Sequence, residues 1–148
     1  MHPSVGGLKQ LIKLNLKDCK SLENLPHELN LESLEILILS GCSKLKKFPE
    51  IGRDMMSLSE LYLDGTAIEE LPPSIKHITG LTLLNLQDCK NLLSFRSVIC
   101  SLTFLEILTL SGCKGLQQIE ALPCTDLKTP EPVPINLLLA CCLSRSQD

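Results

Sequence analysis

Pairs of leucines separated by a single residue recur along the chain at nearly constant intervals. The first leucine of each pair is Leu14, Leu37, Leu61, Leu84 or Leu108, so the spacings alternate between 23 and 24 residues. Side chains two residues apart point to the same face of a β-strand. A fixed period of this length is typical of a solenoid, in which each unit buries its apolar side against its neighbours. The pattern therefore predicts five repeats, each with one short strand.

Further apolar residues surround each leucine pair at fixed positions. Leu, Ile, Met or Phe occupies these positions in every repeat, and in the first repeat they are Leu8, Leu11, Leu22 and Leu25. Pro26, Pro49 and Pro72 follow the last of them in repeats one to three. Proline fixes φ and lacks an N–H donor, which disfavours a regular helix. We therefore expect short parallel strands on the concave side and irregular or 3₁₀ segments on the convex side.

A turn must follow each of these short strands. Gly41, Gly65 and Gly112 stand at the turn in three repeats, and Asp18 and Asp88 take the same place in the other two. Glycine supplies the backbone freedom that a tight turn needs, and aspartate is a common turn former. We expect the chain to reverse direction at these five residues.

Half of the eight cysteines occupy one position, directly after the turn residue: Cys19, Cys42, Cys89 and Cys113, with Thr66 in the third repeat. We expect these side chains to point inward as reduced, buried groups, where a polar atom needs a backbone partner. The alternative is a disulfide between Cys19 and Cys42, or between Cys89 and Cys113, because adjacent strands lie ~4.8 Å apart. The chain has no Cys-x-x-Cys motif and its three histidines are scattered, so we predict no metal site.

The composition argues against several classes of function. The 148 residues carry a net charge of -3, one Tyr and no Trp, which disfavours nucleic-acid binding. No apolar run approaches the ~20 residues of a membrane helix, and the N-terminal residues do not form a secretory signal. Cys141 and Cys142 have no histidine near them in the sequence. We therefore expect no membrane partner, no enzymatic activity and no cofactor.

The repeats divide the chain into three regions. Residues 1–7 match the return limb of a repeat, because the Pro-Ser-Val at 3–5 resembles the Pro-Ser-Ile at 73–75, and we interpret them as the remnant of a preceding repeat. The alternative is that they form a minimal cap. Residues 8–123 hold the five repeats. Residues 124–148 form a tail, Pro-rich and then apolar, which we expect either to be loosely attached or to cover the last repeat.

Three segments resemble a known family. Residues 14–22 are Leu-Asn-Leu-Lys-Asp-Cys-Lys-Ser-Leu, and residues 39–51 and 63–75 contain Leu-Ser-Gly-Cys-Ser-Lys-Leu and Leu-Asp-Gly-Thr-Ala-Ile. They resemble the leucine-rich repeats of plant intracellular immune receptors that carry a Toll/interleukin-receptor-like domain and a nucleotide-binding domain. The resemblance covers residues 3 to about 123 and includes the non-leucine positions. It implies an α/β-type leucine-rich repeat solenoid, although Cys or Thr stands where such repeats more often carry Asn.

The resemblance also implies a function in plant defence. The repeats of such receptors sense pathogen effectors or guarded host proteins and restrain the nucleotide-binding domain, so the expected partners are a protein ligand and that domain. The chain lacks the Gly-x-x-x-x-Gly-Lys-Ser/Thr phosphate loop, so nucleotide binding is not carried over to it. The expected location is the cytoplasm, with the nucleus as an alternative. A free-standing scaffold or adaptor without an immune role is the second hypothesis.

The candidate binding residues are those that flank the leucines of each predicted strand. We call these fifteen residues the strand face. They form three columns across the repeats: Lys13, Ile36, Glu60, Leu83 and Ile107; Asn15, Ile38, Tyr62, Asn85 and Thr109; and Lys17, Ser40, Asp64, Gln87 and Ser111. The family uses these columns for contacts, and here they are chemically mixed while the leucine positions are nearly constant.

Four bulky aliphatic residues lie within the strand face, namely Ile36, Ile38, Leu83 and Ile107. Contiguous apolar surface often marks an interface. The alternative is that β-branched residues simply suit strands and that isolated exposed apolar residues are ordinary. A second candidate is a basic ridge formed by the lysines after the turns, Lys20, Lys44, Lys90 and Lys114. We favour a solvated edge for these lysines, because exposed charges contribute little individually.

Overall fold

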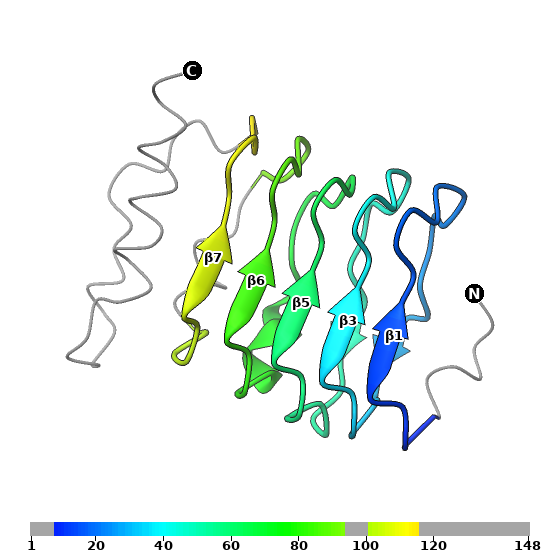
Figure 1. The fold of residues 1–148 in the computed structure, drawn as a ribbon, viewed down its shortest axis with the longest axis vertical. Coiled ribbons are helices and arrows are strands. Elements are labelled where there is room, and N and C mark those ends of the chain that lie inside the picture. Colours follow the sequence, from blue (N-terminus) through cyan, green and yellow to red (C-terminus); the bar gives the residue numbers. More distant parts are fainter. Residues whose placement is uncertain (1–7, 94–100, 116–148) are drawn as a thin grey trace.

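The computed structural model describes residues 8–93 and 101–115, which form a stack of coils with five short parallel strands side by side (Figure 1). The strands are β1 (Lys13–Asn15), β3 (Ile36–Ile38), β5 (Glu60–Tyr62), β6 (Leu83–Asn85) and β7 (Ile107–Thr109). They form one sheet in the order β1-β3-β5-β6-β7. The predicted leucine-rich repeat solenoid is therefore confirmed.

The leucine pairs set the register of the sheet. Leu14 is opposite Leu37, Leu37 is opposite Leu61, and the same alignment continues through Leu84 to Leu108. Backbone hydrogen bonds continue past the strand ends, as the second leucine of a pair donates its N–H to the next coil, for example Leu39 to Tyr62 at 2.8 Å. Both leucines of each pair are therefore held in line with those of the next coil.

From the second coil onward the leucine pairs are fully buried. Leu37, Leu39, Leu61 and Leu63 are each 0% exposed and belong to a single apolar core that runs through the stack. Five leucines of the first coil are only partly buried and pack against that core from one side, namely Leu11, Leu14, Leu16, Leu22 and Leu25. In the described part of the chain no coil covers their other side. Leu8 is 49% exposed, so the prediction that it joins the buried positions was wrong. The predicted core is confirmed, with the first coil forming its partly exposed end.

All five turn residues have a positive φ, which confirms the predicted turns. Gly41 and Gly112 have φ values of 77°, and Asp18 and Asp88 have values of 59° and 56°. The two residue types are also coupled between coils. A Cβ added to Gly41 would overlap Oδ1 of Asp18, and one added to Gly112 would overlap Oδ1 of Asp88. An aspartate in one coil therefore requires a glycine in the next.

The buried thiols hydrogen-bond to the backbone of the preceding coil. Cys42 Sγ donates to the Leu16 carbonyl at 3.1 Å, Cys89 Sγ to the Leu63 carbonyl at 3.0 Å, and Cys113 Sγ to the Leu86 carbonyl at 2.9 Å. Each thiol therefore links two coils, as well as filling the core.

The other two residues at this position differ from the pattern. Thr66 donates its hydroxyl within its own coil, to the Leu63 carbonyl at 2.7 Å. Cys19 is exposed, so the prediction that it points into a buried site was wrong. It belongs to the first coil, whose outer side no other described coil covers. All four of the described cysteines are free, so the alternative of a disulfide between neighbouring coils was also wrong.

The return limbs of the first three coils, which the structure describes in full, are short and mostly irregular, as predicted. A 3₁₀ helix, η2 (Pro73–His77), follows Pro72 in the third coil. The sequence did not predict the small parallel pair formed by β2 (Glu28–Leu29) and β4 (Glu50–Ile51) on the limbs of the first two coils. Side chains of η2 continue this pairing, because Ser74 Oγ accepts the N–H of Ile51 at 2.9 Å and His77 Nδ1 lies 3.0 Å from its carbonyl oxygen.

Three regions lie outside the described residues, namely 1–7, 94–100 and 116–148. Two interpretations concern these regions and lie outside the described residues. They are the repeat remnant at residues 1–7 and the tail at residues 124–148. Within the described ranges, no helix is long and apolar enough to cross a membrane.

Candidate protein-binding surface

The sheet register forms the first two predicted columns of the strand face. Ile36 is paired with Lys13 on one side and with Glu60 on the other, while Tyr62 is paired with Ile38 and Asn85. Every residue of the strand face is exposed or partly exposed except Ser40, which is 8% exposed. The prediction that Ser40 faces solvent was therefore wrong, and its hydrogen bond explains why.

Two side-chain hydrogen bonds order the centre of the strand face. Ser40 Oγ donates to Oδ1 of Asp64 at 2.6 Å, across from the second coil to the third. Tyr62 donates its hydroxyl to Oε2 of Glu60 at 2.7 Å. The hydrogen bond to Glu60 is the main reason that the pKa of Tyr62 is raised, with smaller contributions from partial burial and the charges of Glu60 and Asp64. The tyrosine and both carboxylates are thus held in place without any ligand.

Two asparagines of the second column stabilise the chain beyond the strands. Asn15 Oδ1 accepts the backbone N–H of Lys17 at 3.0 Å, and Asn85 Oδ1 accepts that of Gln87 at the same distance. These local bonds resemble turn-forming contacts between a side chain and the backbone two residues on. Part of this column therefore has a structural task in addition to any binding task.

The aliphatic residues of the strand face form two patches. Ile36 and Ile38 are partly buried on β3, whereas Leu83 on β6 is paired with Ile107 on β7, which is 52% exposed. The polar third coil lies between the two patches. The face therefore offers apolar contact area on both sides of an acidic and aromatic centre.

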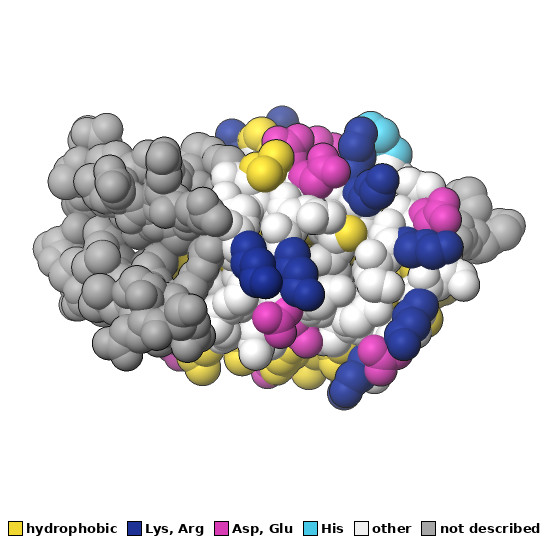
Figure 2. Space-filling model, turned by 90° about the horizontal axis from the view of Figure 1, so that it is seen from above, with side chains coloured by type: hydrophobic (Ala, Val, Ile, Leu, Met, Phe, Trp, Pro, Cys, Tyr) yellow, Lys and Arg dark blue, Asp and Glu magenta, His cyan; other side chains and the backbone are white. Residues whose placement is uncertain are grey.

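The lysines after the turns do not form a continuous ridge. Figure 2 views the edge where the strands end, and its Lys and Arg side chains are interspersed with acidic and uncharged groups. Ala67 takes the corresponding place in the third coil and interrupts the row. Lys44 Nζ lies 3.7 Å from Glu23 Oε1, and both side chains are 62% exposed. This arrangement agrees with a solvated edge, whose exposed ion pair contributes little to stability.

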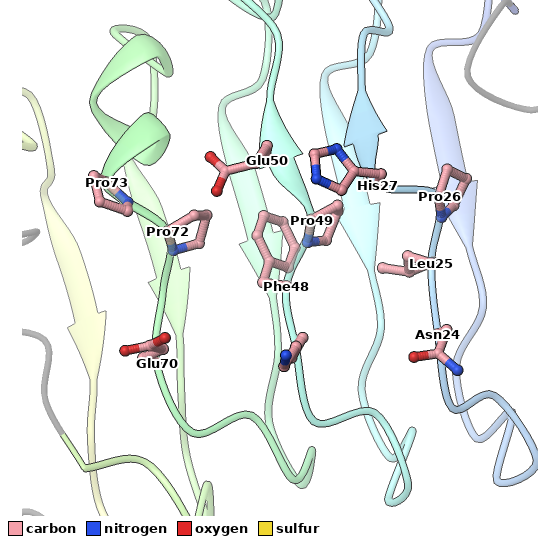
Figure 3. A pocket seen from close by; sticks show the side chains of 11 residues that line it. Asn24, Leu25, Pro26, His27, Phe48, Pro49, Glu50, Glu70, Pro72 and Pro73 are labelled. Atoms are coloured by element: carbon pink, nitrogen blue, oxygen red, sulfur yellow. The ribbon is translucent and has the colours of Figure 1, made fainter.

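A groove lies on the return limbs and was not anticipated from the sequence. It has a volume of about 390 Å³, and Figure 3 shows Pro26, Pro49 and Pro72 side by side along it on neighbouring limbs. His27 and Glu50 also line it. The Glu50 carboxylate accepts a hydrogen bond from Ser74 of the next coil, so it already has a structural partner. The recurring Leu-Pro and Phe-Pro pairs are the feature of the sequence that could have indicated this groove.

The described residues include no metal-binding cluster, and two of their buried thiols have raised pKa values. They contain no group of three His, Cys, Asp or Glu side chains that could hold a metal ion. Burial is the largest cause of the raised pKa values of Cys42 and Cys89. A thiol with a raised pKa is a poor nucleophile at neutral pH.

Comparison with known proteins places these repeats among plant disease resistance proteins. Residues 29–122 match the family model described as "Disease resistance protein RPS4B-like, leucine-rich repeats". Disease resistance protein RPS4B of Arabidopsis thaliana is 40% identical over 97% of the chain. Protein SUPPRESSOR OF npr1-1, CONSTITUTIVE 1 of the same species is 43% identical over 76% of the chain, and TMV resistance protein N of Nicotiana glutinosa is 42% identical over 80%.

The aligned region is a small part of each relative. It spans 13% of Disease resistance protein RPS4B, 8% of the second protein and 10% of TMV resistance protein N. The likeness therefore concerns the repeat region and not the whole of these proteins. Because the family model matches more than half of the chain and covers the described coils from β2 to β7, the chain belongs to the RPS4B-like leucine-rich repeat family of plant disease resistance proteins.

Proposed function

We propose that this chain is the protein-recognition module of a plant immune receptor and that its strand face binds a pathogen effector or a guarded host protein. The observation that carries the proposal is the contrast between the two sides of each strand. The inner side is a nearly invariant series of leucines, buried from the second coil onward, whereas the outer side combines Ile38, Tyr62 and Ile107 with charged and amide groups. Exposed aromatic and aliphatic residues of this kind are typical of interfaces.

The same module would restrain a nucleotide-binding domain in a full-length receptor. This part of the proposal rests on the family to which the chain belongs. It also rests on the fact that the chain aligns with only a small part of each relative, so a full-length receptor would contain further domains. We further propose that the chain acts by binding alone, without enzymatic activity, in the cytoplasm or the nucleus.

The proposal is tested by affinity capture from leaf extract with three versions of the 148-residue chain. These are the wild type, Ile38→Glu on the strand face, and Lys76→Glu on η2 as a matched control on the opposite limb. We expect the wild type and the control to retain a common set of proteins that Ile38→Glu loses. Retention of the same proteins by all three folded chains would contradict the assignment of the strand face.

A further inference from the structure

The strand face carries opposite charges on its first and third coils. Lys13 begins the strand of the first coil and Lys17 follows it, whereas Glu60 begins the strand of the third coil and Asp64 follows that one. Register pairing makes Ile36 the residue between Lys13 and Glu60. The surface therefore changes from basic to apolar to acidic over three neighbouring strands.

The acidic coil is ordered but its charge is not neutralised. Ser40 and Tyr62 each donate a hydrogen bond to one oxygen of a carboxylate, and no other described residue hydrogen-bonds to the second oxygen. Neither Glu60 nor Asp64 takes part in an ion pair with a described residue. Between them lies Tyr62, and the face of an aromatic ring attracts a cation. The arrangement favours a positively charged side chain from outside.

The spacing of the three bands suggests the shape of the partner. Adjacent strands lie ~4.8 Å apart, so the basic and acidic bands are roughly 10 Å apart. An α-helix rises 1.5 Å per residue, so residues seven apart share one face at a separation of about 10.5 Å. Residues three and four along the helix lie between them on that face. A helix lying across the strands would thus match all three bands.

We propose that the strand face binds an amphipathic helix of a partner protein in one defined orientation. An Arg or Lys of the helix lies on Tyr62 between Glu60 and Asp64. An acidic residue two turns away meets Lys13 and Lys17, and apolar residues between them cover Ile36 and Ile38. This inference rests on the proposed function, because it specifies the partner of the same surface. The reversed helix would place like charges together, which disfavours a wrong partner or orientation.

The inference is tested by selection from a phage-displayed library. The library randomises positions i, i+3, i+4 and i+7 on an exposed helix of a stable monomeric scaffold, and the target is the 148-residue chain. We expect selected helices to carry opposite charges at i and i+7, in either order because a helix can lie in either direction across the strands, and apolar residues at i+3 or i+4. Replacing both charged residues of a selected helix by Gln should weaken its binding at least about tenfold.

Variants of the chain supply the matched controls. The double variant Glu60→Gln, Asp64→Asn preserves side-chain size and should weaken binding of the selected helices at least fivefold. Charge reversal by Glu60→Lys and Asp64→Lys makes both bands basic, so it should weaken binding at least as much as the isosteric variant, provided that the reversed variant shows the wild-type circular dichroism spectrum. If the variant with two lysines does not fold, the double variant Glu60→Gln, Asp64→Asn still tests the inference.

The outcomes separate this inference from the proposed function. Helices that bind at the strand face, as shown by sensitivity to Ile38→Glu, but carry no charge pattern would overturn the inference alone. A library that yields no binders would also overturn the inference alone, because the proposed function does not require a helical partner. Selected binders that are insensitive to Ile38→Glu would count against both proposals.

Discussion

The hydroxyl of Tyr62 donates a hydrogen bond of 2.7 Å to Oε2 of Glu60, two residues earlier on the same strand. Side chains two residues apart on a strand share one face, so this bond lies on the exposed side of β5. Together with the bond from Ser40 to Asp64, it orders the middle of the strand face in the free protein. Less conformational entropy is then lost when a partner binds.

The first prediction concerns the ionisation of Tyr62, which is the only tyrosine in a chain without tryptophan. Its pKa is raised above the usual value of 10, mainly by the bond to Glu60. The bond therefore contributes to folding stability below about pH 10, the pKa of an unfolded tyrosine, and this contribution is lost as the pH rises through the higher pKa of the folded protein. Absorbance of the tyrosinate during a pH titration measures the folded pKa directly. We expect Glu60→Gln to lower it toward 10, and an unchanged midpoint would contradict the hydrogen bond.

The second prediction separates the core from the strand face. Leu39 is 0% exposed, so Leu39→Ala should lower the free energy of unfolding by ~2–5 kcal/mol. The neighbouring Ile38 points outward and is partly exposed, so Ile38→Glu should cost about 1 kcal/mol or less. Urea unfolding followed by circular dichroism measures both values. Equal destabilisation by the two substitutions would show that the division of roles is wrong.

The third prediction concerns the coupling between Asp18 and Gly41. Gly65→Ala should cost ~1–2 kcal/mol, because φ is 70° and the nearest atoms to an added Cβ are 3.6 Å away. Gly41→Ala should cost a further ~1–3 kcal/mol, because the new Cβ would also overlap the Asp18 side chain. Adding Asp18→Gly should remove most of that excess. The measurement is a double-mutant cycle of unfolding free energies, and additive effects would argue against the contact.

The fourth prediction ranks the reactivity of the described cysteines. Cys19 is exposed, whereas Cys42 and Cys89 are buried and burial raises their pKa values. Iodoacetamide should therefore alkylate Cys19 at least about tenfold faster than the other two at pH 8. Peptide mass spectrometry at several reaction times gives the three rates. The difference should disappear in urea, and a slow Cys19 in the native protein would imply that another segment covers it.

Most of the fold can be predicted from the sequence, because the same leucine contacts and turns recur in every coil. The Leu-x-Leu period fixes the strands, and the glycines and aspartates lie at the expected turns, where they have a positive φ. The position of Cys19 was predicted wrongly because a repeat pattern assumes that every coil has two neighbours. The β2–β4 pair was missed because two-residue strands leave no alternating pattern to detect.

The strand face was only partly predictable for a different reason. Alternation along each strand identified its outward residues, and the register placed Glu60 between Ile36 and Leu83. Alternation cannot show that Ser40 donates to Asp64 or that Tyr62 donates to Glu60, since those bonds depend on side-chain geometry. Ser40 and Asp64 belong to different coils and are 24 positions apart in the sequence.

The most direct test of the account uses the single tyrosine as a label at the centre of the strand face. Replacing Tyr62 by a fluorinated tyrosine gives the chain one fluorine-19 resonance, because no other tyrosine is present. The resonance is recorded as a protein captured from leaf extract is added, and gel filtration confirms that the complex forms. We predict that the resonance shifts in proportion to the complex formed. An unchanged resonance in a confirmed complex would contradict binding at the strand face.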